Sequence, residues 1–163
     1  MLTQDEVAKM SLEERLGRLA AGPEKMVAAI AGQNEAVLAR RPDARSWAPK
    51  EVVCHLRDTE ESFMQRFQAI LVMDEPKFLP VEPDRWAEER QYLRNNAGEA
   101  LGAFRKRREE TLALLRGLTA QQWPRGGVHA VRGRMTMDDW LSLMVWHDEN
   151  HLDQLRRGLR GEP

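Results

Sequence analysis

The sequence predicts an all-α protein, a four-helix bundle with a short extra N-terminal helix. Apolar residues recur at steps of three and four along most of the chain, and glycine and proline separate the periodic segments. No series of segments shows the alternation expected of strands. Because the 163 residues contain no internal repeat or linker, we expect one bundle domain over residues 1–163.

The short N-terminal helix is predicted to begin at Ser11, whose hydroxyl can cap the first turn while Glu14 completes a capping box. Gly22-Pro23 is expected to interrupt this helix, with Pro23 opening the first long helix. That helix is expected to stop near Arg41-Pro42. Its apolar face carries Met26, Ile30, Val37 and Leu38.

Ser46-Trp47-Ala48-Pro49 starts the second long helix, and the proline-rich residues 76–83 end it. One inward stripe runs along this helix at steps of three and four. The stripe comprises Val52, His55, Leu56, Thr59, Phe63, Phe67 and Ile70. A third long helix is predicted from about residue 87 to residue 117. Its apolar side comprises Leu93, Ala97, Leu101, Phe104, Thr111, Leu112 and Leu115.

The last helix follows a loop rich in helix breakers, residues 123–134. Thr136 is its predicted N-cap, and Asp139 stands three residues on as the partner in a capping box. The helix is expected to end before Gly158 or Gly161, since glycine favours C-terminal caps. Four amphipathic helices joined by short-to-moderate loops are typical of a bundle.

Composition narrows the class of function. Hydrophobic residues make up 42% and charged residues 31% of the chain, and the formal charge of -1 argues against a polyanion binder. No uncharged stretch approaches the roughly 18 residues that span a bilayer, and the first residues lack the apolar core of a signal peptide. The single cysteine, Cys54, suits a reducing compartment. We expect a cytoplasmic protein that binds neither nucleic acid nor membrane.

The segment His147-Asp148-Glu149-Asn150-His151 carries the sharpest chemical signal. Residues four apart lie one above the other on a helix, so these two imidazoles can hold the same ion. Trp140, Met144 and Leu155 continue the same stripe, which places both histidines on the apolar side. The motif also fits two core histidines satisfied by hydrogen bonds. It is not the zincin motif, because its second position is aspartate rather than glutamate.

His55 adds a third imidazole from another helix. It lies near the start of its helix, whereas His147 and His151 lie in the middle to late part of the last helix. If these two helices run antiparallel, the three rings can meet at one level. Three histidines leave a coordination position open, which indicates a catalytic or ligand-binding metal rather than a structural one. Composition and spacing alone leave the metal site and the core histidines equally open.

Several segments resemble the DinB/YfiT-like superfamily. Residues 46–60 resemble its "W-s-x-x-E-v-x-x-H-l-x-D" segment, and residues 133–152 resemble its closing "G-x-x-T…H-D-x-x-H" pattern. Between them, residues 80–87 and Tyr92 resemble an interhelical "D-x-x-W-A" loop, and residues 104–112 resemble "F-x-x-x-R-x-x-x-L" of the third helix. The resemblance covers about residues 46–155, with the landmarks in the order of the family.

The resemblance implies a four-helix bundle, often a homodimer, that binds one divalent ion such as zinc or nickel. His55, His147 and His151 match the three metal ligands of the family. The resemblance also implies a chemistry linked to a low-molecular-weight thiol, either S-transfer or isomerisation, on a small-molecule substrate.

Further candidates for the site are Asp58 and Arg108. Asp58 follows His55 by one turn and could accept the proton of that imidazole, or form a cap or surface ion pair. Arg108 stands in the seam of its helix, where it either receives an anionic substrate group or, as we favour, locks a carboxylate structurally. Cys54 is expected to pack rather than react, and His129 to lie at the surface rather than act as a shuttle or fourth ligand.

The leading hypothesis is a metalloenzyme whose ion binds a thiol cofactor as thiolate, which attacks an electrophilic substrate. The transfer chemistry is implied by the resemblance, whereas the residues themselves supply only the ion and its open position. An alternative is hydrolysis by a metal-bound hydroxide, for which Glu60 or Glu61 could serve as a base if it turned inward. A third possibility is a non-catalytic, metal-containing bundle that binds a small molecule or a partner protein.

Overall fold

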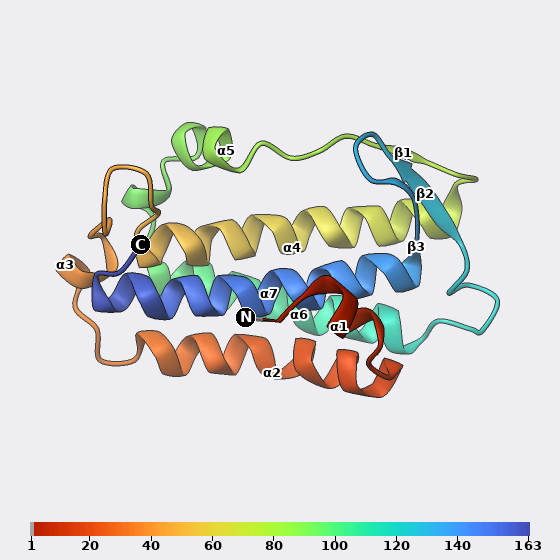
Figure 1. Cartoon of the computed structure of the whole chain (residues 1–163), viewed down its shortest axis with the longest axis horizontal. Helices are drawn as coiled ribbons and strands as arrows, with labels where there is room; N and C mark the ends of the chain where they lie inside the picture. Colours follow the sequence, from red (N-terminus) through yellow and green to blue (C-terminus); the bar gives the residue numbers. More distant parts are fainter. Residues whose placement is uncertain (1) are drawn as a thin grey trace.

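A computed structural model describes residues 2–163 of the protein. The bundle consists of α2 (Leu12–Ile30), α4 (Pro49–Val72), α6 (Ala97–Arg116) and α7 (Met137–Arg160). A short helix, α1 (Gln4–Ala8), precedes the bundle and packs against α7 (Figure 1). The predicted all-α four-helix bundle is therefore confirmed. The short extra helix is α1, however, and not the segment from Ser11 to Gly22, which forms the first half of α2. In residues 2–163 no helix combines the length and the apolar character needed to cross a bilayer.

The four long helices form a square in which α2 and α4 each pack against both α6 and α7. In Figure 1, α4 and α6 run in one direction, and α2 and α7 run in the other. The start of α4 lies against the end of α7. A Cβ atom added to Gly158 of α7 would lie only 3.4 Å from the Cγ atom of Pro49 of α4. The helices that carry His55 and the other two histidines are thus antiparallel neighbours, as the three-histidine hypothesis requires.

Because α4 and α6 are parallel, the chain must return along the bundle between them, and residues 73–96 make this return (Figure 1). The connections carry short elements. They are α3 (Glu35–Leu38), β1 (Lys77–Phe78), α5 (Pro83–Glu89), the 3-10 helix η1 (Tyr92–Arg94), β2 (Gly126–His129) and β3 (Gly133–Thr136). β2 pairs with β1 in parallel and with β3 in antiparallel orientation.

The small sheet was not predicted from the sequence. Its strands are two to four residues long, which is too short for an alternating pattern to show. Gly127 is required where β1 and β2 meet, since a Cβ atom there would lie 2.5 Å from the ring of Phe78. The glycines of this loop therefore allow close strand pairing as well as breaking the helical pattern.

Pro23 does not break the first helix, contrary to the prediction. α2 begins at the predicted cap, where Ser11 Oγ accepts the N–H of Glu14, and continues to Ile30. Proline has no N–H, so the C=O of Leu19, four residues earlier, lacks its helical donor. Arg108 of α6 donates to this oxygen through Nη1 at 2.9 Å. A neighbouring helix thus supplies the hydrogen bond that proline removes.

The helix predicted over residues 87–117 is also wrong, because the chain turns between α5 and α6. Gln91 has a left-handed backbone with φ 50°, and Asn96 caps α6 by accepting an N–H of its first turn. Leu93, expected on the apolar side, is 39% exposed. Asn96 was the signal for this boundary, since asparagine is a strong N-cap residue.

The boundaries predicted for the helices that carry the histidines are confirmed. Pro49 occupies the first position of α4, and the predicted inward stripe of this helix is buried. Thr136 and Asp139 form the reciprocal capping box of α7. Gly161 ends α7 with φ 77°, so of the two predicted glycine stops the later one is used.

Arg108 bonds to all three other bundle helices. Its Nε and Nη2 donate to both carboxylate oxygens of Glu60 in α4, at 3.0 and 2.6 Å. Its Nη1 donates to Asp148 of α7 at 2.6 Å and to the Leu19 carbonyl of α2. Burial alone would lower the pKa of Arg108, but the charges of Asp148 and Glu60 raise it. This arrangement supports the structural role favoured for Arg108.

Replacing Arg108 with methionine is expected to lower the free energy of unfolding by about 3–5 kcal/mol, because two buried carboxylates lose their cation. Urea denaturation followed by circular dichroism measures the change. Arg105→Met is the matched control, since Arg105 lies on the same helix in an exposed pair with Glu24 and should cost at most about 1 kcal/mol. Equal losses in both variants would contradict the role of Arg108.

Asp58 of α4 forms hydrogen bonds that hold the return connection, residues 73–96, against this helix. Its carboxylate accepts hydrogen bonds from Arg57 at 2.7 Å, from Arg90 at 2.6 Å and from the hydroxyl of Tyr92 at 2.7 Å. Burial would raise the pKa of Asp58, but these hydrogen bonds outweigh it and lower the pKa below its ordinary value. The ionised form therefore stabilises the fold.

Asp58→Asn is expected to lower the free energy of unfolding by about 1–3 kcal/mol at pH 7. Because the pKa is lower in the folded state, the wild-type advantage should be complete above about pH 4 and should disappear as the pH falls further. Denaturation at pH 7 and pH 3 tests this. Asp74→Asn, at an exposed position, is the control and should show no such dependence.

Candidate metal centre

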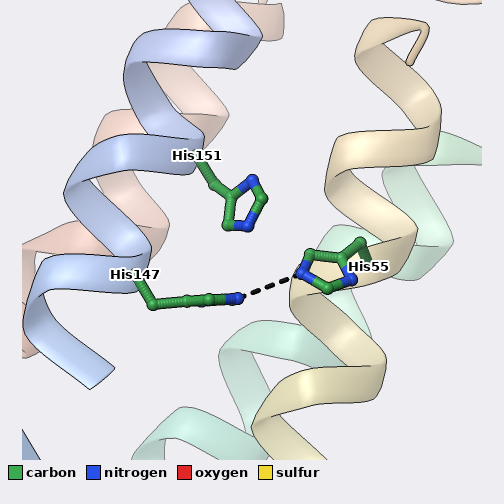
Figure 2. A group of neighbouring side chains, drawn as sticks. All are labelled: His55, His147 and His151. Atoms are coloured by element: carbon green, nitrogen blue, oxygen red, sulfur yellow. Dashed lines mark hydrogen bonds between the residues drawn. The ribbon is translucent and has the colours of Figure 1, made fainter. Parts of the chain in front are cut away.

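The three histidines singled out in the sequence lie together in the structure. His55 extends from α4 towards His147 and His151, which stand one turn apart on α7 (Figure 2). The Nε2 atoms of His55 and His147 are 3.0 Å apart, and one nitrogen from each of the three rings lies within 4.8 Å of the others. The antiparallel packing of α4 and α7 thus produces the predicted convergence.

The surroundings keep at least two of the rings neutral. Burial, followed by the neighbouring His147 and His151, holds the pKa of His55 well below its ordinary value. Burial and His147 lower the pKa of His151 to about 3, even though Gln154 and Asp148 act in the opposite direction. Neutral imidazole is the form that binds a metal ion.

The donor set fits a divalent metal ion. Gln154 Oε1 lies 2.7 Å from His151 Nδ1, and because this oxygen can only accept, the lone pair of His151 is on Nε2. Histidine nitrogens lie about 2.0–2.1 Å from zinc, so two of them on one ion are at most about 4.2 Å apart. The 3.0 Å between His55 and His147 lies within this limit, and the 4.8 Å that bounds the set of three nitrogens is about 0.6 Å above it. The arrangement is thus chemically suited to zinc, nickel or a similar ion.

Asp148 is a residue of this region that the sequence motif did not assign. Its Oδ1 lies 3.8 Å from Nδ1 of His147, and its Oδ2 accepts from Arg108. Burial would raise the pKa of Asp148, but Arg108 lowers it, so the group stays ionised. The distance of 3.8 Å is too long for a hydrogen bond, so Asp148 contributes a nearby negative charge to His147. The signal in the sequence was the position of Asp148, directly after His147 in α7. An aspartate buried in this helix needs a cationic partner, which Arg108 supplies.

The histidine cluster forms part of the wall of a cavity of about 580 Å³. The cavity lies between α4 and α7 and is bounded also by residues 80–84 and by the β2–β3 hairpin. Aromatic rings contribute much of its wall. These rings belong to Trp47, Phe63, Trp140 and Trp146. A ligand of this size would contact both the histidines and a largely apolar surface.

His129 lies in the cavity wall, not at the surface as expected. It is 7% exposed and its ring packs edge-on against Trp140, with 5.8 Å between the centroids. Its Nδ1 accepts the backbone N–H groups of Val131 and Arg132, each at 3.2 Å. It does not belong to the three-histidine cluster. The hairpin formed by β2 and β3 buried it, and this hairpin was absent from the predicted fold.

The carboxylates considered as general bases do not face the cluster. Glu60 is engaged by the buried arginine of α6, and Glu61 forms an ion pair with Arg107 at 2.6 Å. Asp84 lines the cavity and accepts the indole N–H of Trp47 at 3.1 Å. Among residues 2–163, Asp84 supplies the only carboxylate in the cavity lining.

Two other candidates lie away from the cavity. The carboxylate of Asp58 is held by Arg57, Arg90 and Tyr92, so the structure does not bring it to the imidazole of His55. Cys54 is fully buried among apolar side chains, and burial raises the pKa of its thiol to about 11. Its predicted packing role agrees with this position.

Comparisons with known proteins agree with the motifs. A sequence model of the DinB superfamily matches residues 18–155. The chain is 30% identical over 107 residues to a protein of Bacillus subtilis named "Putative metal-dependent hydrolase YfiT". This alignment covers 65% of the present chain and 60% of the relative. The chain is also 21% identical over 126 residues to OB0413 of Oceanobacillus iheyensis, which bears the same description, covering 77% of this chain and 72% of that one.

The fold is also shared with a solved structure of YfiT from Bacillus subtilis, reported to have an unusual four-helix bundle topology. The TM-score is 0.84 at 23% identity, and the superposition covers 98% of this chain and 89% of the other. Since the family match extends over most of the residues from α2 to α7, the chain belongs to the DinB superfamily.

Proposed function

We propose that the protein is a divalent-metal-dependent enzyme acting on a small molecule, with the ion held by His55, His147 and His151. One observation carries the proposal: three imidazoles from two helices converge in the wall of a cavity large enough for an organic substrate. A structural metal would be enclosed by four protein ligands. The names of the relatives as metal-dependent hydrolases support the proposal.

A divalent ion bound there would supply Lewis-acid chemistry, lowering the pKa of a water molecule or thiol in its remaining position. The protein's own residues surround the histidines and fix the tautomer of one of them. Gln154 fixes the tautomer of His151, and the carboxylate of Asp148 stands beside His147. Trp47 and Phe63 pack against the histidines, with centroid distances of 4.9 Å to His55 and 5.8 Å to His147.

Hydrolysis is the reaction type we propose first, since the relatives are described as hydrolases. Thiol S-transfer or isomerisation is the second candidate, and a specific observation favours it. Within the described chain, one carboxylate lines the cavity, that of Asp84, and its Oδ1 already accepts the indole N–H of Trp47. A thiol would need less help from a base than water, because the ordinary pKa of a thiol is far below that of water.

The metal site is tested by elemental analysis of the protein after loading with zinc or nickel. We expect one equivalent of metal in the wild type and its loss in His55→Ala, because two remaining histidines from one helix bind an ion far more weakly. His129→Ala is the control and should keep the metal. Circular dichroism should show that both variants stay folded. Full metal content in His55→Ala would exclude the cross-helix site.

The reaction type is tested with the zinc- and nickel-loaded protein. One panel contains nitrophenyl esters and nitroanilides without thiol, and the other contains 1-chloro-2,4-dinitrobenzene with cysteine as the thiol. Hydrolysis predicts turnover in the first panel and S-transfer predicts thiol-dependent turnover in the second, in each case lost in His147→Ala because the ion is lost. Turnover unchanged in His147→Ala would show that the reaction does not use this site.

A further inference from the structure

We infer that the cavity binds an organic anion, an apolar or aromatic body with a carboxylate or phosphate group, and that Arg66 recognises the anionic group. This inference extends the proposed function, because it takes the same cavity as the substrate site. Its support lies in the part of the cavity wall around Trp140, and none of it depends on a metal ion.

The charge of the cavity wall is positive and uncompensated. Three arginines line it, Arg45, Arg66 and Arg132, and none has a carboxylate within ion-pair distance among residues 2–163. Asp84 is the single acidic residue of the wall, and its carboxylate is bonded to Trp47. Arg45 and Arg132 are exposed at the rim, whereas Arg66 is half-buried. The fixed positive charge inside the cavity is therefore that of Arg66.

Aromatic rings and one carbonyl hold the guanidinium of Arg66. Its Cζ lies 4.7 Å from the ring centroid of Trp140 and 5.9 Å from that of Phe78. Nη2 donates to the carbonyl of Leu79 at 3.1 Å, and its other N–H groups have no acceptor among the described residues. A guanidinium carries five N–H donors in a planar fork that matches a carboxylate or phosphate. Arg66 is thus positioned and still has donors for a ligand.

No carboxylate of residues 2–163 compensates the charge of the half-buried Arg66. Burial lowers its pKa, but a guanidinium remains charged at neutral pH. Arg108, the fully buried arginine of the neighbouring α6, is paired with two carboxylates. A partly buried cation without such partners is stabilised when an anion binds.

His129 adds a second donor beside Arg66. Because Nδ1 of His129 accepts two backbone N–H groups, its ring proton is on Nε2. Its ring and the Arg66 guanidinium both contact Trp140. Burial, with the charges of Arg66 and Arg132, lowers the pKa of His129, so the ring is a neutral donor. The cavity wall around Trp140 therefore offers a neutral N–H donor as well as the guanidinium of Arg66.

Aromatic rings lie between Arg66 and the histidines. The Cα atoms of Arg66 and His55 are eleven residues apart on α4, about 16 Å along the helix axis. Phe63, one turn before Arg66, packs against His147 with 5.8 Å between the ring centroids. Phe63 and Trp140 stand between Arg66 and the histidines, 6.1 Å apart in an edge-to-face pair. An anionic group at Arg66 therefore places an apolar body against these rings and directs its far end towards the histidines.

Three matched probes test the inference by calorimetric titration: 2-naphthoate, 2-naphthyl phosphate and the neutral 2-naphthamide. The full-length protein is used as purified and again after treatment with EDTA. We expect an anion to bind at least about tenfold more tightly than the amide in both preparations. The preference between carboxylate and phosphate then identifies the anionic group.

Arg66→Met should lower the affinity for the preferred anion at least about tenfold and leave the affinity for 2-naphthamide unchanged. Arg66→Lys should restore part of the loss, since lysine keeps the charge without the planar fork. Arg105→Met, outside the cavity, should bind like the wild type. If Arg66→Met does not fold, Arg66→Lys and the comparison of anion with amide in the wild type decide the question.

The inference would be overturned by equal binding of anion and amide, by binding of no probe, or by unchanged anion affinity in folded Arg66→Met. Loss of anion binding only after EDTA would also overturn it, because the ion rather than Arg66 would then hold the anion. If the protein takes up no metal even after loading with zinc or nickel while its anion binding still depends on Arg66, this inference stands and the proposed metalloenzyme is contradicted.

Discussion

The guanidinium of Arg108 is the contact on which the arrangement of the four helices depends. It binds a carboxylate from α4, a carboxylate from α7 and the carbonyl that Pro23 leaves free in α2. A buried network of this kind is favourable only when every partner is present, so it restricts how the helices can slide or rotate. Because Asp148 is adjacent to His147 and Glu60 follows His55 on α4, the same contact sets the level at which the histidines meet.

The cavity combines two kinds of chemistry on the same pair of helices. One part of its wall carries the three imidazoles, and another part carries a guanidinium packed against aromatic rings. The parallel arrangement of α4 and α6 contributes to the cavity, because it forces the return connection along the bundle and places residues 80–84 over the cavity. Helix order, which is a property of the whole fold, thus helps to enclose a site with two kinds of polar group.

Local patterns were sufficient to predict the helices that carry the histidines. The stripes of α4 and α7, the Thr136 cap and the inward position of His55 all follow from spacing along one helix. The errors arose where contacts between residues far apart in the sequence determine the local structure. The continuity of α2 through Pro23 depends on Arg108, which is 89 positions from Leu19. The burial of His129 likewise depends on strand pairing. Such contacts leave no periodic signal in the sequence.

The separation of the histidines along the chain has a consequence for biosynthesis. His55 and His147 are 92 positions apart, and α7 contributes two of the three imidazoles. A growing chain that has made α2, α4 and α6 contains only one of the three histidines, His55, and lacks the fourth bundle helix, α7. The site therefore cannot form on the ribosome before the last helix emerges, and occupancy by an ion would mark chains whose folding is complete.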